Sequence, residues 1–338
     1  MRHKIVIPLA LIGIVIIFII SGIVGFEDII REILKSDISY LFIFLLIQIL
    51  MIFLWALKWR VMLIHYDVSF KNVLLTSSFG YLMNNLTPIG GAGGEPFRAY
   101  LLARVDKIST ENSMASVILD LFSEVLLIIV LLFFAISFLL KFGIPWVIGI
   151  FLGIIGIILL VISVVVISLM INKNFSLRMI QRVIGISKRL PIIKNHAMDA
   201  EKRIDEILAN FLDAMKKTMA NIYILWTGIF IALIIRFISI FRMYLIFKML
   251  GTDVPLMTIF IVQISTTAIV FLSFLPGALG IWEGISTWLF TFFNIAAPTA
   301  MAAILIERIF SYWIGSLIGL ISTMYLGATY YLKKYFRE

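Results

Sequence analysis

The stretch Thr87-Pro88-Ile89-Gly90-Gly91-Ala92-Gly93-Gly94-Glu95-Pro96 interrupts an apolar region that spans residues 72–105. A second apolar region, residues 256–294, is interrupted by Leu275-Pro276-Gly277-Ala278-Leu279-Gly280. The arms that follow the breaks have about ten residues from Glu95 and about a dozen from Trp282, too short at 1.5 Å per residue to cross a hydrocarbon core of ~30 Å. Both regions are therefore predicted to be re-entrant hairpins of broken helix. One alternative is that both arms of each region cross the membrane. Another is a mixture, in which one region crosses and the other is re-entrant.

The composition indicates that lipid is the main solvent of this chain. Of its 338 residues, 62% are hydrophobic and 14% are charged, and the mean hydropathy is +1.11. Soluble domains carry about 25% charged residues, so this chain could not cover a water-facing surface. It has no cysteine and only three histidines, all outside the apolar runs, so no metal site and no cofactor are expected.

Six further runs of roughly 20 apolar residues are predicted to span the membrane. They are residues 5–25, 38–57, 113–140, 144–171, 222–250 and 298–332. The first run is longer than the apolar part of a signal peptide, about 7–15 residues, and is expected to be retained. The prediction is one all-α, polytopic transmembrane domain over residues 1–338.

The charges of the connections predict one orientation, because cytoplasmic loops are rich in Lys and Arg. The two termini, the connection 58–71 and the segment 172–221 are basic, whereas the loop at residues 27–37 is acidic. The segment 172–221 holds ten Lys and Arg against five Asp and Glu, and its apolar residues have amphipathic helix spacing. We expect a multi-pass protein of the cell membrane with this segment and both termini in the cytoplasm. The net charge of +9 is interpreted mainly as this loop bias and in smaller part as attraction to anionic lipid headgroups, and no nucleic-acid partner is expected.

In this orientation the first hairpin opens to the cytoplasm and the second opens to the outside. Each hairpin lies between two spans, within residues 38–140 and residues 222–332 respectively. Glu95 precedes Asp120 by 25 residues, and Glu283 precedes Glu307 by 24. This arrangement predicts an inverted-topology repeat, which is common in transporters.

The two breaks are candidate binding sites for an anion. Irregular backbone at membrane depth is tolerated only inside protein or beside water. Helix starts near Glu95 and Trp282 would present free N–H groups and the positive end of a helix dipole, which together favour phosphate. Close helix packing by small residues is the alternative. The predicted binding residues of the breaks are Gly90, Gly91, Gly93, Gly94, Pro276, Gly277 and Gly280.

Charged residues inside the apolar runs form the second part of the predicted site. A charge at a helix centre costs about 2.5–3.5 kcal/mol on insertion scales, so these side chains should face the interior and pair. Structural ion pairs are an alternative for all of them, most of all for Glu124 and Arg242. Lys58 and Arg60 are expected to extend to the cytoplasmic interface, and Trp55, Trp59, Trp226, Trp313, Tyr330 and Tyr331 to anchor span ends there. The predicted charged site residues are Glu95, Arg98, Asp120, Glu124, Arg236, Glu283, Glu307 and Arg308.

The sequence carries no signature of a known catalytic site. It lacks a P-loop, a His-Glu-x-x-His motif, a nucleophile elbow and an Asp-x-Asp pair. An enzymatic activity is therefore not expected.

Residues 88–102, with Gly90-Gly91, Gly93-Gly94, Glu95-Pro96 and Arg98, resemble the lysylphosphatidylglycerol synthase transmembrane-region family. The stretch from Leu275 to Glu283 resembles the second Pro-Gly-x-x-Gly-x-x-Glu signature of that family. Asp120 with Glu124, and Glu307 with Arg308, stand where the family tends to carry polar residues. The resemblance covers nearly the whole chain.

The resemblance implies a flippase-like domain. In bifunctional members this region translocates an aminoacylated phospholipid that a separate C-terminal soluble domain synthesises. Here the chain ends at Glu338, so aminoacyl transfer is not implied. Some archaeal relatives are linked to lipid-linked sugar pathways, which leaves the cargo open.

The leading hypothesis is a translocase for an anionic phospholipid or a polyprenyl-phosphate-linked lipid. Its headgroup would enter a central cavity between the hairpins while its tail stays in the bilayer. One alternative is a membrane-embedded glycosyl or headgroup transferase that uses Glu95 or Glu283 as a base. Another is a non-transporting partner subunit of a lipid-modifying enzyme.

Overall fold

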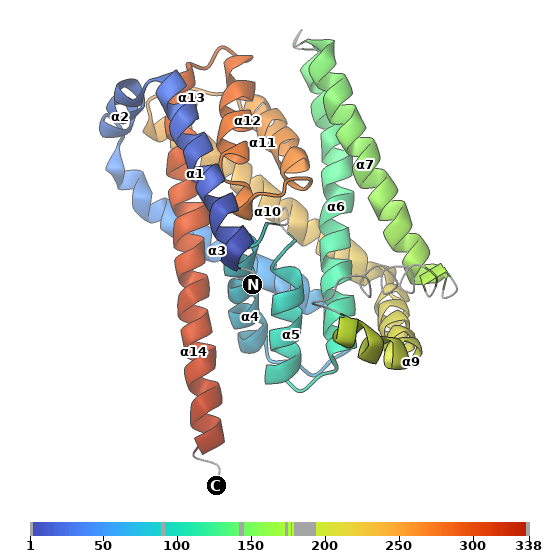
Figure 1. Ribbon diagram of the computed structural model, residues 1–338. Coiled ribbons are helices and arrows are strands. Elements are labelled where there is room, and N and C mark those ends of the chain that lie inside the picture. The colour runs from blue at the N-terminus through green and yellow to red at the C-terminus, as the bar shows by residue number, and fades with distance from the viewer. Residues whose placement is uncertain are drawn as a thin grey trace.

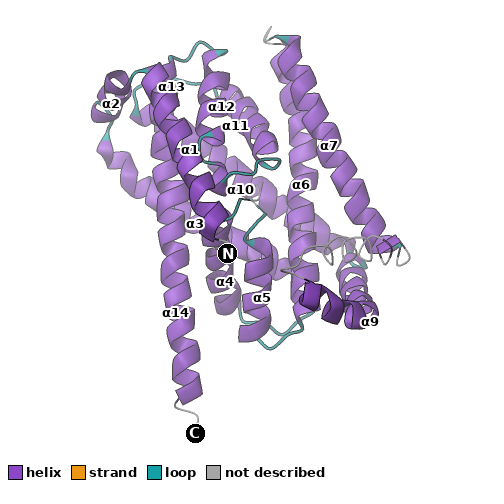
Figure 2. Ribbon diagram, viewed as in Figure 1, coloured by secondary structure: helices purple, strands orange, loops and turns teal. Residues whose placement is uncertain are grey.

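The fold is all-α, as the sequence predicts. The computed structural model describes residues 3–88, 92–141, 145–172, 175, 176, 178 and 194–335, and this part of the chain contains no strand (Figures 1 and 2). Its helices are joined by short connections, most of them a few residues long.

The long helices confirm a multi-pass membrane protein. Within the described ranges, five segments are long and apolar enough to cross a membrane, or six if the bent pair at the N-terminal end counts as one span. The five segments are the one that contains α3 (Leu41–Met62), then α6 (Thr110–Lys141), α7 (Trp146–Ile171), α10 (Ile222–Met249), and the stretch formed by α13 (Ala297–Arg308) and α14 (Gly315–Tyr335). The bent pair consists of α1 (His3–Val24) and α2 (Phe26–Leu34).

Helix α2 (Phe26–Leu34) was expected to be an acidic loop, and that expectation was wrong. The chain turns by 88° between α1 and α2. Gly25 makes this corner with a φ of 106°, which a residue with a side chain rarely adopts. The helix is amphipathic: Ile29 is buried against Met301 and Ala302 of α13, while acidic residues occupy its first turn. The segment has too few apolar residues to form a span, so it was classified as a loop from its charges, and the 3.6-residue period of its apolar positions was overlooked.

The two predicted hairpins are present as broken helices. The first consists of α4 (Phe70–Leu86) and α5 (Glu95–Val105), and the second of α11 (Leu256–Val270) and α12 (Ile281–Thr291), with a short 3-10 turn, η2 (Pro276–Ala278), in its break. Helices α5 and α12 have 11 residues each, which is ~16 Å, about half of a hydrocarbon core. The hairpins enter the bundle from opposite ends, and α4 contacts η2 where they meet (Figure 1).

The predicted span 298–332 is not one regular helix. Helices α13 and α14 are joined by a π-helical segment, η3 (Ile309–Ile314), which begins directly after Glu307 and Arg308. Such segments are rare and occur often at functional sites. The sequence pattern does not reveal this one, because apolar residues continue through it.

Helix α9 (Lys194–Met219) forms the described part of the predicted amphipathic segment. Leu208, Leu212 and Met215 are buried, and α9 packs mainly against α6. The N-terminal part of that segment lies outside the described residues, apart from isolated positions. In Figure 1, α9 lies at the same end of the bundle as the C-terminus and the connection from α5 to α6.

Candidate functional site

A cavity of about 280 Å³ lies where the two broken hairpins meet. Its walls come from both halves of the chain: α3, α4, α5 and α6 on one side, α10, α11 and α12 on the other. The volume is close to the lower limit of small-molecule sites, about 300 Å³. Its polar lining residues are Gln48, Tyr81, Asn84, Asn85, Glu95, Asp120, Glu124, Arg236, Ser239 and Thr267.

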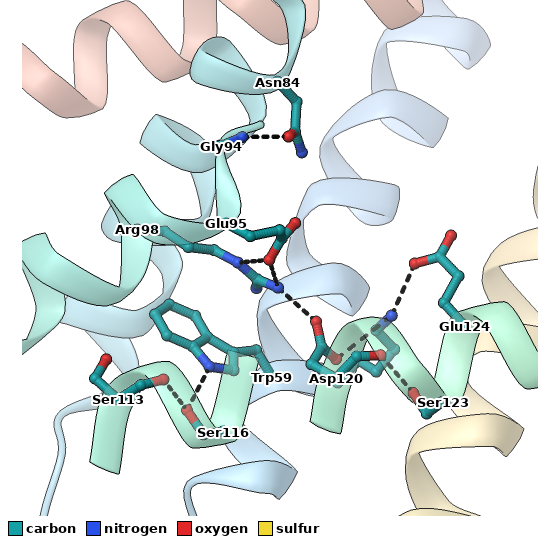
Figure 3. A network of polar contacts seen from close by, with 11 residues as sticks. Trp59, Asn84, Gly94, Glu95, Arg98, Ser113, Ser116, Asp120, Ser123 and Glu124 are labelled. Atoms are coloured by element: carbon teal, nitrogen blue, oxygen red, sulfur yellow. Dashed lines mark hydrogen bonds and ion pairs between the residues drawn. The ribbon is translucent and has the colours of Figure 1, made fainter. Parts of the chain in front are cut away.

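Six charged residues beside this cavity form what we call the first charge cluster: Lys58, Glu95, Arg98, Asp120, Glu124 and Arg236. Arg98 donates from Nε to Glu95 at 2.6 Å and from Nη2 to Asp120 at 2.6 Å. Figure 3 shows Arg98 between these two carboxylates. Arg98 therefore links α5 to α6, the next helix along the chain.

Lys58 and Arg236 complete the first charge cluster from α3 and α10. The Lys58 ammonium lies 3.0 Å from Glu124 and 3.4 Å from Asp120. Its side chain is only 1% exposed, so the expectation that Lys58 extends to the interface was wrong. Arg236 Nη2 lies 3.6 Å from Glu124, and its Nη1 donates to Thr267 Oγ1 at 3.1 Å.

Two tryptophans predicted to be interface anchors instead hold Arg98. The guanidinium carbon lies 4.6 Å from the centroid of the Trp55 ring and 4.5 Å from that of Trp59. Trp59 is fully buried, and its indole N–H donates to Ser116. This stacking compensates part of the lost hydration of the guanidinium. Trp226 and Trp313 are exposed, as an anchoring role requires, and Tyr330 and Tyr331 have no described side chains.

A second charge cluster, Arg242, Glu283, Glu307 and Arg308, lies in the second half. Arg242 Nη2 donates to Glu307 at 2.5 Å, and Arg308 Nε donates to Glu283 at 2.5 Å. Arg308 also donates to the Gly277 carbonyl at 2.7 Å, which ties α13 to the break. These residues do not line the cavity.

Polar side chains connect the cavity to the second charge cluster. Gln48 lines the cavity and accepts from Arg242 at 2.6 Å. Tyr81 donates to the Ser311 carbonyl of η3 at 2.8 Å, and Asn85 donates to Ser316 at 2.9 Å. The C-terminal end of α4 thus contacts the irregular segment η3 and the start of α14 directly.

The two helix starts are capped differently. Glu283 accepts from the Gly280 N–H at 2.6 Å, so its carboxylate caps α12. Glu95 does not cap α5, because its carboxylate contacts Arg98. Asn84 takes the corresponding position: its Oδ1 accepts from the Gly94 N–H at 2.5 Å (Figure 3).

Close packing accounts for three of the glycines predicted to bind an anion. A Cβ on Gly94 would lie 1.9 Å from the Gly80 carbonyl oxygen, and one on Gly280 would lie 2.7 Å from Ile16 of α1. Gly277 has a φ of 55°, and a Cβ there would lie 2.3 Å from the Tyr312 ring. Gly93 and Pro276 are buried away from the cavity lining, and Gly90 and Gly91 lie outside the described residues.

Four predicted site residues line the cavity: Glu95, Asp120, Glu124 and Arg236. Sequence reasoning missed Lys58, Asn84 and Asn85. The sequence holds no signal for the role of Lys58, because a lysine near the end of an apolar run usually reaches water. The Asn pair could have been found as polar residues just before a break. Among the described residues, no group of His, Asp and Glu has the arrangement of a metal site.

A bundle of membrane-spanning helices with two broken hairpins around a cavity lined by charged residues defines a polytopic membrane protein with an internal polar site. The chain belongs to the family described as the lysylphosphatidylglycerol synthase TM region, whose match covers residues 5–319. Among its relatives is a UPF0104 membrane protein of Methanothermobacter thermautotrophicus, 29% identical over 342 residues that cover 97% of each chain. A UPF0104 membrane protein of Pyrococcus horikoshii is 25% identical over 92% of this chain and 94% of its own length. One of Methanocaldococcus jannaschii is 25% identical over 94% of this chain and 93% of its own length.

Proposed function

We propose that this protein moves a lipid with an anionic, phosphate-bearing headgroup across the cell membrane, with the headgroup in the central cavity. The family name connects the chain with the lipid lysylphosphatidylglycerol. The cavity is too small for a whole lipid, since ~300 Å³ is the lower limit even for small-molecule sites. The acyl or isoprenoid tail would therefore stay in the bilayer.

The observation that carries this proposal is the loose pairing of Arg236. Its closest carboxylate, Glu124, is 3.6 Å away, whereas Arg98, Arg242 and Arg308 each have a carboxylate oxygen within 2.6 Å. Arg236 also lines the cavity, beside the hydroxyl of Thr267. A planar guanidinium with free donors is well suited to a phosphate.

The order of elements supports alternating access by two related halves. In each half a long helix precedes a broken hairpin whose second arm has 11 residues, and another long helix follows. The hairpins enter from opposite ends (Figure 1), as in transporters built from inverted repeats. We propose that one half rocks against the other around the cavity.

The test is lipid movement in proteoliposomes with a fluorescent phosphatidylglycerol whose outer-leaflet label can be quenched. Arg236→Ala should slow the movement by about tenfold or more, because one charge-assisted contact is lost. Glu95→Gln and Glu283→Gln should slow it as well, because each removes the carboxylate that holds Arg98 or Arg308 in position. Arg104→Ala is the control, since Arg104 lies on the outer face of α5.

Parent rates in all three variants would overturn the central site and leave these charges as structural pairs. Recovery of a chemically altered lipid would favour the transferase alternative instead. Mass spectrometry of lipids that copurify with the protein identifies the headgroup to use next.

A further inference from the structure

The first charge cluster is electrically neutral as a group. It contains three carboxylates, on Glu95, Asp120 and Glu124, and three basic side chains, on Lys58, Arg98 and Arg236. An anion that enters the cavity adds a negative charge to this balanced set. In a poorly solvated interior an uncompensated charge is strongly unfavourable, so the group should gain a positive charge when the anion binds.

Glu124 is the carboxylate most affected by an anion at Arg236. Its Oε1 faces Arg236 at 3.6 Å, and its Oε2 accepts from Lys58 at 3.0 Å. If Arg236 turns to a phosphate, Oε1 loses the one basic partner that the described part of the chain gives it. Lys58 cannot compensate fully, because its ammonium also neutralises Asp120 at 3.4 Å.

Glu124 is also the most accessible of the three acids. Its side chain is 28% exposed, against 8% for Glu95 and 1% for Asp120. The polar and charged groups around it come from every neighbouring element of the cavity wall. They are Gln48 and Lys58 on α3, Tyr81, Asn84 and Asn85 on α4, Glu95 and Arg98 on α5, Asp120 on its own helix, Arg236 and Ser239 on α10, Thr267 on α11 and Trp282 on α12.

We propose that Glu124 takes up one proton when a lipid phosphate binds at Arg236, so that a proton accompanies each lipid through the cavity. This inference rests on the proposed function and adds a proton as co-substrate. A hydronium ion from water in the cavity supplies the proton, which forms an O–H bond on the Oε1 that Arg236 has left. When the lipid departs, Arg236 returns to Glu124 and the proton is released to water.

The coupling determines whether the affinity for the lipid rises or falls with pH. Because a proton enters with the lipid, mass action requires the affinity for the lipid to fall as pH rises. A uniform tenfold loss of affinity per pH unit corresponds to about one proton per lipid. Without coupling, the affinity would be constant between about pH 6 and about pH 8, since phosphodiesters do not titrate there.

Isothermal titration calorimetry of the detergent-purified protein with dioctanoyl phosphatidylglycerol measures this proton number. Titrations in two buffers with different ionisation enthalpies should report uptake of about one proton per lipid for the parent protein. Glu124→Gln should still bind the lipid, with no uptake and with an affinity that no longer depends on pH. Glu124→Asp keeps a titratable carboxyl and should restore uptake. Glu111→Gln, on the same helix but outside the cavity lining, should behave as the parent.

The outcomes separate this inference from the proposed function. Lipid binding by the parent protein without proton uptake overturns the coupling and leaves the proposed function intact. Uptake that persists in Glu124→Gln overturns the assignment to Glu124. No lipid binding by the parent protein overturns both. The measurement on the parent protein is sufficient to test the coupling, even if a variant does not fold.

Discussion

Arg98 shows how individual side chains make a buried charge tolerable. It is fully buried, contacts two carboxylates and lies over two indole rings. Removal of one partner from a buried ion pair is usually far more costly than the pair is stabilising, because the other charge stays behind. Here two carboxylates would stay behind, on Glu95 and Asp120.

Arg98→Ala should therefore lower the free energy of unfolding by about 3–5 kcal/mol. Arg104→Ala on the same helix should lower it by less than about 1 kcal/mol, because it removes only an exposed contact with Tyr100. Thermal unfolding of both variants in the same detergent compares them. Equal melting temperatures would contradict the structural weight given to Arg98.

At this scale the sequence predicted that buried charges exist and pair, but not which residues pair. Arg98 and Asp120 are 22 positions apart, and Arg242 and Glu307 are 65 apart. Such partners are set by how the helices pack, which periodicity does not report. Lys58 was misread for a related reason: a lysine near a helix end usually reaches water, and only the packed α6 supplies its carboxylates.

The break of the first hairpin depends on contact between two backbones. Gly94 begins α5 against the Gly80 carbonyl of α4, where a side chain has no room. Pro and Gly in the sequence located both breaks, because these residues interrupt helices for local steric reasons. The corner at Gly25 and the π-helical segment η3 escaped prediction, because they depend on packing against α13 and the first hairpin.

Gly94→Ala should destabilise the protein by about 1–3 kcal/mol, because α4 and α5 must move apart to admit the methyl group. Gly153→Ala in α7 is the matched substitution, since a Cβ there meets nothing within 4 Å. It should stabilise the protein by about 0.5–1 kcal/mol through helix propensity. Shifts of the two melting temperatures in the same direction would refute this account of the break.

For the whole molecule, the order of spans and hairpins was predictable, since hydropathy and chain breaks are local properties. The sequence predicted the position of the cavity, between the two broken hairpins, but not its lining. Its lining, with Gln48, Asn84 and Thr267, required the packed structure. The orientation and the repeat are predictions from loop charge and element order.

The predicted orientation can be tested on a chain without cysteine. Asp28→Cys on α2 and Lys216→Cys on α9 introduce single exposed thiols at opposite ends of the bundle (Figure 1). A membrane-impermeant maleimide should label Asp28→Cys on intact cells and should label Lys216→Cys only after lysis. Labelling of Lys216→Cys on intact cells would reverse the proposed topology.

The charge pairing also constrains how the chain enters the membrane during synthesis. Arg242 is made 65 residues before its partner Glu307, so the ribosome delivers a charged α10 before any carboxylate from α13 exists. Gln48 is already present on α3 and bonds Arg242 in the final structure. A hydrogen bond to this amide would give the Arg242 guanidinium a polar partner while α10 leaves the translocon, and in a chain that stopped before α13 Gln48 would remain that partner.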